Sequence, residues 1–187
     1  CSKNTRHDRN VVAFKENEMN ELIQKIEQWA NDRNIIKGSK PIDQAMKLFS
    51  EFGELADNVG KGRDCRDDIG DIFVVLTIIN KQYGKSLHLE DRLVCTRDGL
   101  KECVMWLGYS LADELTDTCH GDKYDCYDSL SILNKIAELT GTTLEECVQI
   151  AYNDIKDRKG VMSNGVFIKE SDPAYASIIA SIESNCE

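Results

Sequence analysis

Five acidic residues, two before a short loop and three after it, have side chains and a spacing suited to binding a metal ion. Two glutamates lie three residues apart in "EFGE", and three aspartates in "DDIGD" lead directly into the apolar stretch Ile72 to Ile79, which only Thr77 interrupts. The five residues are Glu51, Glu54, Asp67, Asp68 and Asp71. Carboxylate oxygens are the ligands that Mg²⁺ prefers, and ions held in this way keep open positions for phosphate oxygens. The pattern is therefore a candidate site for one or two Mg²⁺ ions.

Ordinary structural roles compete with a metal site at these positions. Glu51 can form a surface ion pair with Lys47, one helical turn earlier. The helix macrodipole favours acids in a first turn, which explains Asp67 and Asp68 well and Asp71 less well. The residues that follow Asp71 on its helical row are all apolar, and an ionised carboxylate buried there needs a cation or another charged partner.

The elements that must position these carboxylates are expected to be helices, because the chain has only two prolines. Apolar residues at helical spacing from Met19 predict a helix of about 15 residues that ends at "KGSK". A second helix begins at Pro41 and stops at Gly60 and Gly62. One face of this helix consists of the apolar residues Ile42, Ala45, Met46, Phe49, Phe52, Ala56 and Val59. The short loop that follows makes the next helix antiparallel, so the two acidic groups face each other.

The stretch "IFVVLTII" could be a buried strand or a helix by composition alone. A weak internal repeat favours the helix, since residues 53–84 align with residues 113–141, whose "SLSILNKIAEL" has helical spacing. The alignment pairs four acids of the first copy (Glu54, Asp57, Asp68, Asp71) with four of the second (Glu114, Asp117, Asp125, Asp128). We therefore expect an all-α fold whose four-helix-bundle core consists of two tandem helical-hairpin pseudo-repeats.

The expected domain organisation is one helical domain between two tails. Residues 1–18 are interpreted as an N-terminal tail, residues 19–170 as the domain and residues 171–187 as a C-terminal tail. Within the domain, residues 19–90 form one half and residues 98–160 the repeat half. The segment "TTLEECVQIAYNDIKDR" begins with a capping-box pattern and predicts a further helix.

Charge and apolar content narrow the classes of partner. The 187 residues carry a net charge of −10, which disfavours nucleic acid and anionic membranes as partners. No apolar run approaches the roughly 18 residues of a membrane span, so a cytoplasmic protein is expected. Eight cysteines without CxxC pairs indicate free thiols.

With its flanking segments, the acidic pattern resembles a known family. "EFGE" at 51–54 and "DIGD" at 68–71, with "WANDRNI" before them and "AYNDIKDRKG" and "NGVFIKE" after them, are similar to phage and bacterial proteins of the MazG-like branch. That branch belongs to the all-α nucleoside triphosphate pyrophosphohydrolases, which include all-α dUTPases. The resemblance covers about residues 19 to 170.

The resemblance implies Mg²⁺-dependent hydrolysis of a nucleoside triphosphate to the monophosphate and pyrophosphate, with Mn²⁺ as an alternative ion. It assigns Glu51, Glu54, Asp68 and Asp71 as catalytic metal ligands. Asp68 stands where the family usually has the longer Glu, so Asp67 is an alternative third ligand. Leu111 takes the place of Glu51 in the repeat, and the residue 98–160 half therefore resembles a degenerate copy, as in tandem-repeat dUTPase-like relatives.

A triphosphate also needs fixed cations and contacts for its nucleoside. The candidates are Lys47, Lys61, Arg63, Asn80, Lys156, Arg158 and Lys159, with Trp29 for stacking on the base. A homodimer is possible. The alternative function is a non-catalytic nucleotide-binding protein that sequesters its ligand, and a third reading is a helical interaction module whose acids are only surface groups.

Overall fold

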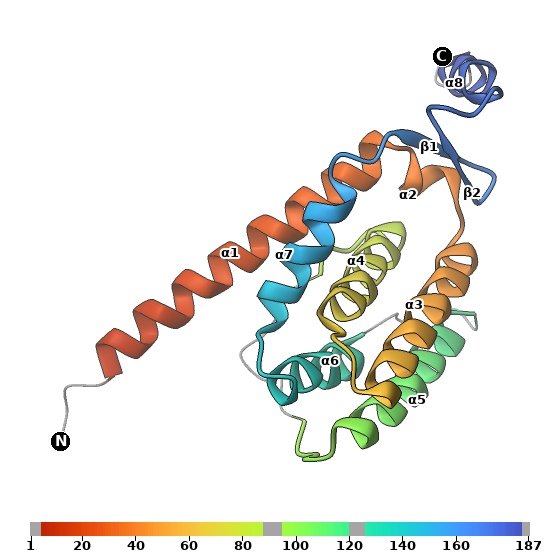
Figure 1. Cartoon of the computed structure of the whole chain (residues 1–187). Helices are drawn as coiled ribbons and strands as arrows, with labels where there is room; N and C mark the ends of the chain where they lie inside the picture. The colour runs from red at the N-terminus through yellow and green to blue at the C-terminus, as the bar shows by residue number, and fades with distance from the viewer. Residues whose placement is uncertain (1–4, 88–94, 120–125, 185–187) are drawn as a thin grey trace.

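Eight helices and one short β-hairpin make up the computed structural model, which describes residues 5–87, 95–119 and 126–184 (Figure 1). The expected all-α class is confirmed. The helices are α1 (Thr5–Asp32), α2 (Ile35–Gly38), α3 (Pro41–Lys61), α4 (Arg66–Gln82), α5 (Leu100–Cys119), α6 (Tyr127–Leu139), α7 (Leu144–Ile155) and α8 (Tyr175–Ser184). The strands β1 (Gly160–Ser163) and β2 (Val166–Lys169) pair antiparallel, with Ser163 opposite Val166.

The core is organised around α4. The hairpins α3–α4 and α5–α6 pack together through α3 against α5 and α4 against α6, which confirms the expected four-helix bundle. Helices α7 and α1 cover the remaining sides of α4 (Figure 1). Every residue from Ile72 to Asn80 is consequently buried. This all-round cover explains why a helix has the continuous apolar composition that is otherwise typical of a central strand.

Several predicted helix boundaries are confirmed. Pro41 is the first residue of α3, and Gly62, in the left-handed conformation with φ 66°, ends it. Thr143 and Glu146 form the expected capping box at the start of α7, in which the Glu146 N–H donates to the Thr143 hydroxyl. Gly60 lies inside α3 and does not stop it.

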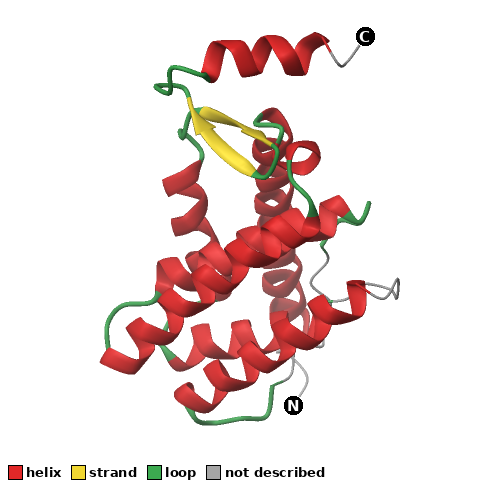
Figure 2. Ribbon diagram, turned by 90° about the vertical axis from the view of Figure 1, so that its right-hand side faces the viewer, coloured by secondary structure: helices red, strands yellow, loops and turns green. Residues whose placement is uncertain are grey.

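The first helix differs from the prediction at both ends. It begins at Thr5 instead of near Met19, because the residues before Met19 include no proline or glycine that would interrupt a helix. It ends at Asp32, before "KGSK", and Asn34 then adopts the left-handed conformation with φ 56°. The segment expected as a C-terminal tail includes α8, which packs on β1 (Figure 2).

The predicted buried face of α3 is confirmed at Ala45 and Val59, which are 4% and 6% exposed, and is wrong at three of its other positions. Ile42, Met46 and Phe49 are 52%, 59% and 37% exposed, respectively. The helix is rotated so that Leu48 and Leu55 are fully buried against its neighbours, and Glu51 lies on the same side. The error arose because apolar residues surround most of α3, so spacing alone did not determine which arc faces α4.

Two further features concern the whole described chain. The five cysteines whose side chains are described all have free thiols, as expected. Among the described residues, no helix combines the length and apolarity that crossing a bilayer would require.

Candidate metal centre

The α3–α4 hairpin brings the two predicted acidic groups to one region. The chain reverses direction between Lys61 and Arg66, so the second half of α3 lies beside the first turns of α4. Glu51 is only 4% exposed, while Glu54, three residues further along α3, is exposed. On α4, Asp68 is buried, Asp71 is half-buried and Asp67 is exposed.

Asp71 experiences the strongest electrostatic effect of this crowding. Its pKa is raised from 3.8 to about 7, first by burial and then by the negative charges of Glu51 and Asp67. Lys47 and Arg158 oppose the shift but do not cancel it. The carboxyl group of Asp71 thus lies among like charges that a bound cation would relieve.

The two other aspartates of α4 belong to the same electrostatic group. Burial also raises the pKa of Asp68, against a hydrogen bond of 2.7 Å that the Asn58 amide donates to its carboxylate. Glu54 and Glu51 are among the negative charges that raise the pKa of Asp68 further. Asp67 is exposed at its surface, but partial desolvation first and the charge of Asp154 second raise its pKa. All five predicted carboxylates therefore interact electrostatically across the α3–α4 hairpin. Both Asp67 and Asp68 remain candidates for the third metal ligand.

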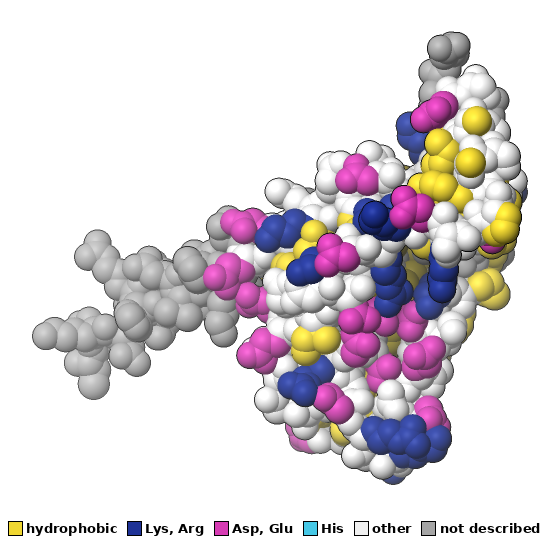
Figure 3. Space-filling model, turned by 45° about the horizontal axis from the view of Figure 1, so that its top comes forward, with side chains coloured by type: hydrophobic (Ala, Val, Ile, Leu, Met, Phe, Trp, Pro, Cys, Tyr) yellow, Lys and Arg dark blue, Asp and Glu magenta, His cyan; other side chains and the backbone are white. Residues whose placement is uncertain are grey.

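Two cations border this acidic centre. Lys47 forms an ion pair with Glu51, and Arg158 lies 3.3 Å from the carboxylate of Asp154 and also lowers the pKa of Asp67 and Asp71. Figure 3 shows acidic side chains gathered on one face of the molecule, with lysine and arginine side chains beside them. Lys47 and Arg158 are thus the predicted substrate-binding residues that the fold brings to the acidic centre.

The donor set of the centre fits a hard divalent cation, because every candidate ligand is a carboxylate. Yet within residues 18–87, 95–116 and 126–184 no three acidic, histidine or cysteine side chains are already close enough to hold a metal ion. Other side chains of the protein contact these carboxylates instead: Lys47 pairs with Glu51, and Asn58 donates a hydrogen bond to Asp68. An ion would have to replace these contacts.

Four predicted phosphate-binding cations are engaged elsewhere. Lys61 and Arg63 both contact Asp57 near the end of α3, at 2.6 Å and 3.5 Å. Lys156 donates to the Asn153 side chain. Lys159 lies 3.5 Å from Glu170 across the β-hairpin. Each has the solvated, paired environment of an ordinary surface charge.

Trp29 and Asn80 have structural contacts instead of the expected substrate contacts. The Trp29 indole N–H donates to the carbonyl oxygen of Ile155 at 2.8 Å, which joins α1 to the end of α7. Asn80 is buried on α4 nine residues after Asp71, roughly 14 Å along a helix. Its amide donates to the Leu76 carbonyl and contacts the Cys126 sulfur at 3.0 Å. The polar groups of both side chains are thus engaged in contacts within the fold.

Asn58 is a residue of the centre that the sequence analysis missed. Its position supplied a signal, because it follows Glu51 by seven residues and Glu54 by four and so lies on the same side of α3. Its amide orients the carboxylate of Asp68 across the hairpin.

The repeat half differs from the first half at the corresponding positions. Cys65 and Cys126 precede α4 and α6 with similar backbone angles, φ −130° and −114°. Counting from these residues places Ser129 opposite Asp68 and Ile132 opposite Asp71, a shift of four residues from the sequence alignment. Ser129 donates from its backbone N–H and its hydroxyl to Glu114, at 3.0 Å and 2.5 Å.

These hydrogen bonds join α6 to α5 within the second hairpin. Leu111 and Ile132 are buried apolar residues, so an equivalent acidic centre is absent from the described side chains of α5 and α6. The side chain of Asp117 and the whole of Asp125, two of the aligned acids, lie outside the described residues.

The raised pKa of Asp71 gives a testable pH dependence of stability. Its folded pKa of about 7 lies above its unfolded value of 3.8, so the folded state loses stability as the pH rises through this window. In EDTA, Asp71→Asn is therefore expected to raise Tm by several degrees at pH 8 and by much less at pH 4.5. Thermal unfolding measures this, with Asp98→Asn, an exposed aspartate before α5, as control. An equal shift at both pH values would contradict the assignment.

The fold and the site define an all-α bundle with one acidic centre between two antiparallel helices. No family model matches the chain, and no solved structure matches it. It is 48% identical over 67 residues to the "Uncharacterized 18.2 kDa protein in rep-hol intergenic region" of Haemophilus phage HP1 (strain HP1c1). The match covers 35% of this chain and 41% of the phage protein. A phage protein is thus among the sequences similar to this chain, and its description names no activity.

Proposed function

We propose that this protein is a Mg²⁺-dependent nucleoside triphosphate pyrophosphohydrolase, which releases pyrophosphate and a nucleoside monophosphate. The observation that carries the proposal is the position of Glu51. Its carboxylate is buried on the side of α3 that faces α4, within the electrostatic range of three aspartates. A stable fold gains little from such an arrangement unless a cation binds there, because like charges and burial both disfavour it.

In this proposal the protein residues have separate roles. Glu51, Glu54, Asp68 and Asp71 would hold the metal, with Asp67 as the alternative to Asp68. Bound Mg²⁺ supplies charge neutralisation for the phosphates and lowers the pKa of a water molecule. Lys47 and Arg158 stand at the border of the centre and are suited to bind phosphate oxygens that extend beyond the metal. Asn58 fixes the orientation of Asp68.

A nucleotide-binding protein without turnover is the second candidate function. The observation that favours it is the ion pair of Lys47 with Glu51, since a protein cation already occupies part of the place that a metal would take. A sequestering protein would bind nucleotide and gain thermal stability without releasing pyrophosphate.

A substrate panel distinguishes these candidates. The full chain is incubated with each common NTP and dNTP in Mg²⁺, in Mn²⁺ and in EDTA, while pyrophosphate release and Tm are measured in parallel. The proposed enzyme releases pyrophosphate from at least one triphosphate in Mg²⁺ and from none in EDTA. Stabilisation without release supports the sequestering protein, and indifference to both metal and nucleotide would reject both.

A further inference from the structure

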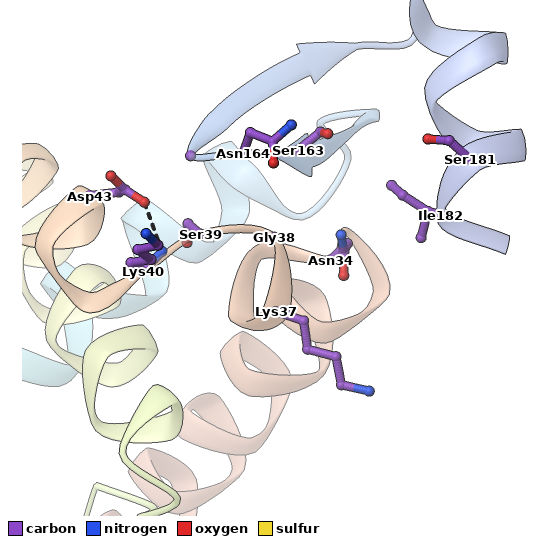
Figure 4. A pocket seen from close by; sticks show the side chains of 11 residues that line it. Asn34, Lys37, Gly38, Ser39, Lys40, Asp43, Ser163, Asn164, Ser181 and Ile182 are labelled. Carbon is purple, nitrogen blue, oxygen red and sulfur yellow. Dashed lines mark hydrogen bonds between the residues drawn. The ribbon is translucent and has the colours of Figure 1, made fainter. Parts of the chain in front are cut away.

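A polar cavity lies at the opposite end of α3 from the acidic centre. It has a volume of about 590 Å³ and is bounded by residues 34–43, by the β-hairpin turn at residues 163–165 and by residues 181–182 of α8 (Figure 4). Lys40 at its edge precedes Glu51 by eleven residues, or roughly 16 Å along a helix. The cavity is therefore separate from the proposed metal centre, and its size suits a small-molecule ligand.

The walls of the cavity are fixed by contacts between segments distant in sequence. The Gly165 N–H donates to the Gly38 carbonyl at 2.8 Å, and the Asn34 amide donates to the Met162 carbonyl at 3.0 Å. A side chain at Gly38 would overlap the same Met162 carbonyl, so only glycine permits this close approach. The hairpin thus packs closely on α2, and these contacts fix the two walls of the cavity that α2 and the hairpin form.

The cavity carries a local excess of positive charge on an acidic protein. Lys37 and Lys40 are both exposed at its rim, and neither ammonium group forms an ion pair with any part of the chain that the structure describes. Asp43 contributes the one carboxylate among the described lining residues. Its oxygen accepts a hydrogen bond from the Lys40 backbone N–H at 2.8 Å, which ties it to the start of α3.

Neutral donors and an apolar wall complete the lining. The hydroxyl of Ser163 and the amide of Asn164 project from the hairpin turn without a hydrogen-bond partner among the described residues (Figure 4). Asn164 has φ 50°, a conformation that non-glycine residues adopt at some energetic cost. Ile182 of α8 offers an apolar surface across the opening.

We propose that this cavity binds a small molecule that bears a phosphate monoester. The Ser163 hydroxyl and the Asn164 amide supply donors for phosphate oxygens. Lys37 extends away from the hairpin turn in Figure 4, so the exposed lysine side chains would turn toward the anion on binding, and charge-assisted hydrogen bonds of this kind are strong. The organic part of the ligand would lie toward Ile182. Binding needs no divalent metal, because the lining has no group of carboxylates.

Calorimetric titration in EDTA tests the proposal, with ribose 5-phosphate and inorganic phosphate as the two probes. We expect ribose 5-phosphate to bind, and Lys37→Ala/Lys40→Ala to weaken its binding at least tenfold, with each single variant intermediate. The control Lys25→Ala/Lys101→Ala removes the same charge from exposed positions on α1 and α5 and should bind like the unchanged protein.

The two probes distinguish the sources of the phosphate. Tighter binding of ribose 5-phosphate supports a ligand with an organic part, and equal binding supports recognition of the phosphate group itself. The proposal is overturned if ribose 5-phosphate does not bind, or if the Lys37/Lys40 variant binds it as tightly as the control. Because the titration excludes metal and triphosphate, its result is independent of pyrophosphate release.

Discussion

Glu51→Gln is expected to lower Mg²⁺-dependent pyrophosphate release at least about 100-fold, since it removes the charge of the most buried carboxylate of the proposed metal centre. Asp71→Asn should have a similar effect. The two substitutions preserve side-chain size, so lost activity would reflect lost charge and not a change in packing. Pyrophosphate release is measured over a range of Mg²⁺ concentrations for each variant with the best triphosphate of the panel.

Glu102→Gln is a matched control for these variants, because it makes the same chemical change at an exposed position on α5. It should retain full activity. Higher Mg²⁺ concentrations should restore part of the activity of a weakened metal site. Activity of Glu51→Gln equal to that of Glu102→Gln would refute a catalytic role for the centre.

Gly70→Ala is expected to destabilise the protein by about 3 kcal/mol, at the upper end of the range for overpacked cores. A Cβ atom at Gly70 would overlap the Cys147 carbonyl oxygen and lie 2.7 Å from the Cβ of Ala151. Both groups belong to α7, where backbone and a short side chain cannot rotate away. We expect Tm to fall by roughly 10 °C for a chain of this size, measured by thermal unfolding in EDTA.

Gly53→Ala is the matched control for Gly70→Ala. It makes the same substitution in the interior of a helix, but no atom lies within 4 Å of the added Cβ. Relief of the entropic cost of glycine should stabilise the protein by about 0.5–1 kcal/mol. Opposite signs for the two variants would establish that α4 and α7 approach each other closely at Gly70, and equal signs would contradict it.

Local signals in the sequence were sufficient to predict most of the helices. Pro41, Gly62 and the Thr143–Glu146 capping box act through backbone geometry within a few residues. In the structure α3 begins at Pro41 and ends before Gly62, and α7 begins directly after Thr143. The helical assignment of residues 72–79 required the comparison with the second hairpin, because composition alone did not distinguish a buried helix from a strand. The proximity of the acidic groups followed from the short loop after α3.

Features that depend on tertiary packing could not be predicted in the same way. The rotation of α3, which buries Glu51 and exposes Met46, is set by which neighbours surround the helix. Trp29 and Asn80 have polar groups that bind distant backbone and side-chain atoms, and no local pattern identifies such partners. Lys61 and Arg63 were plausible phosphate ligands by charge alone, yet the nearby Asp57 engages both.

The central position of α4 restricts how the acidic centre can rearrange. Helices α1, α3, α6 and α7 pack against α4 and fix the backbone that carries the three aspartates. Under the proposed function, the groups free to adjust to a ligand would be the exposed side chains of Lys47 and Arg158. The carboxylates of α4 would keep their positions in this proposal, and the two cations at the border of the acidic centre would adapt to ligands of different size.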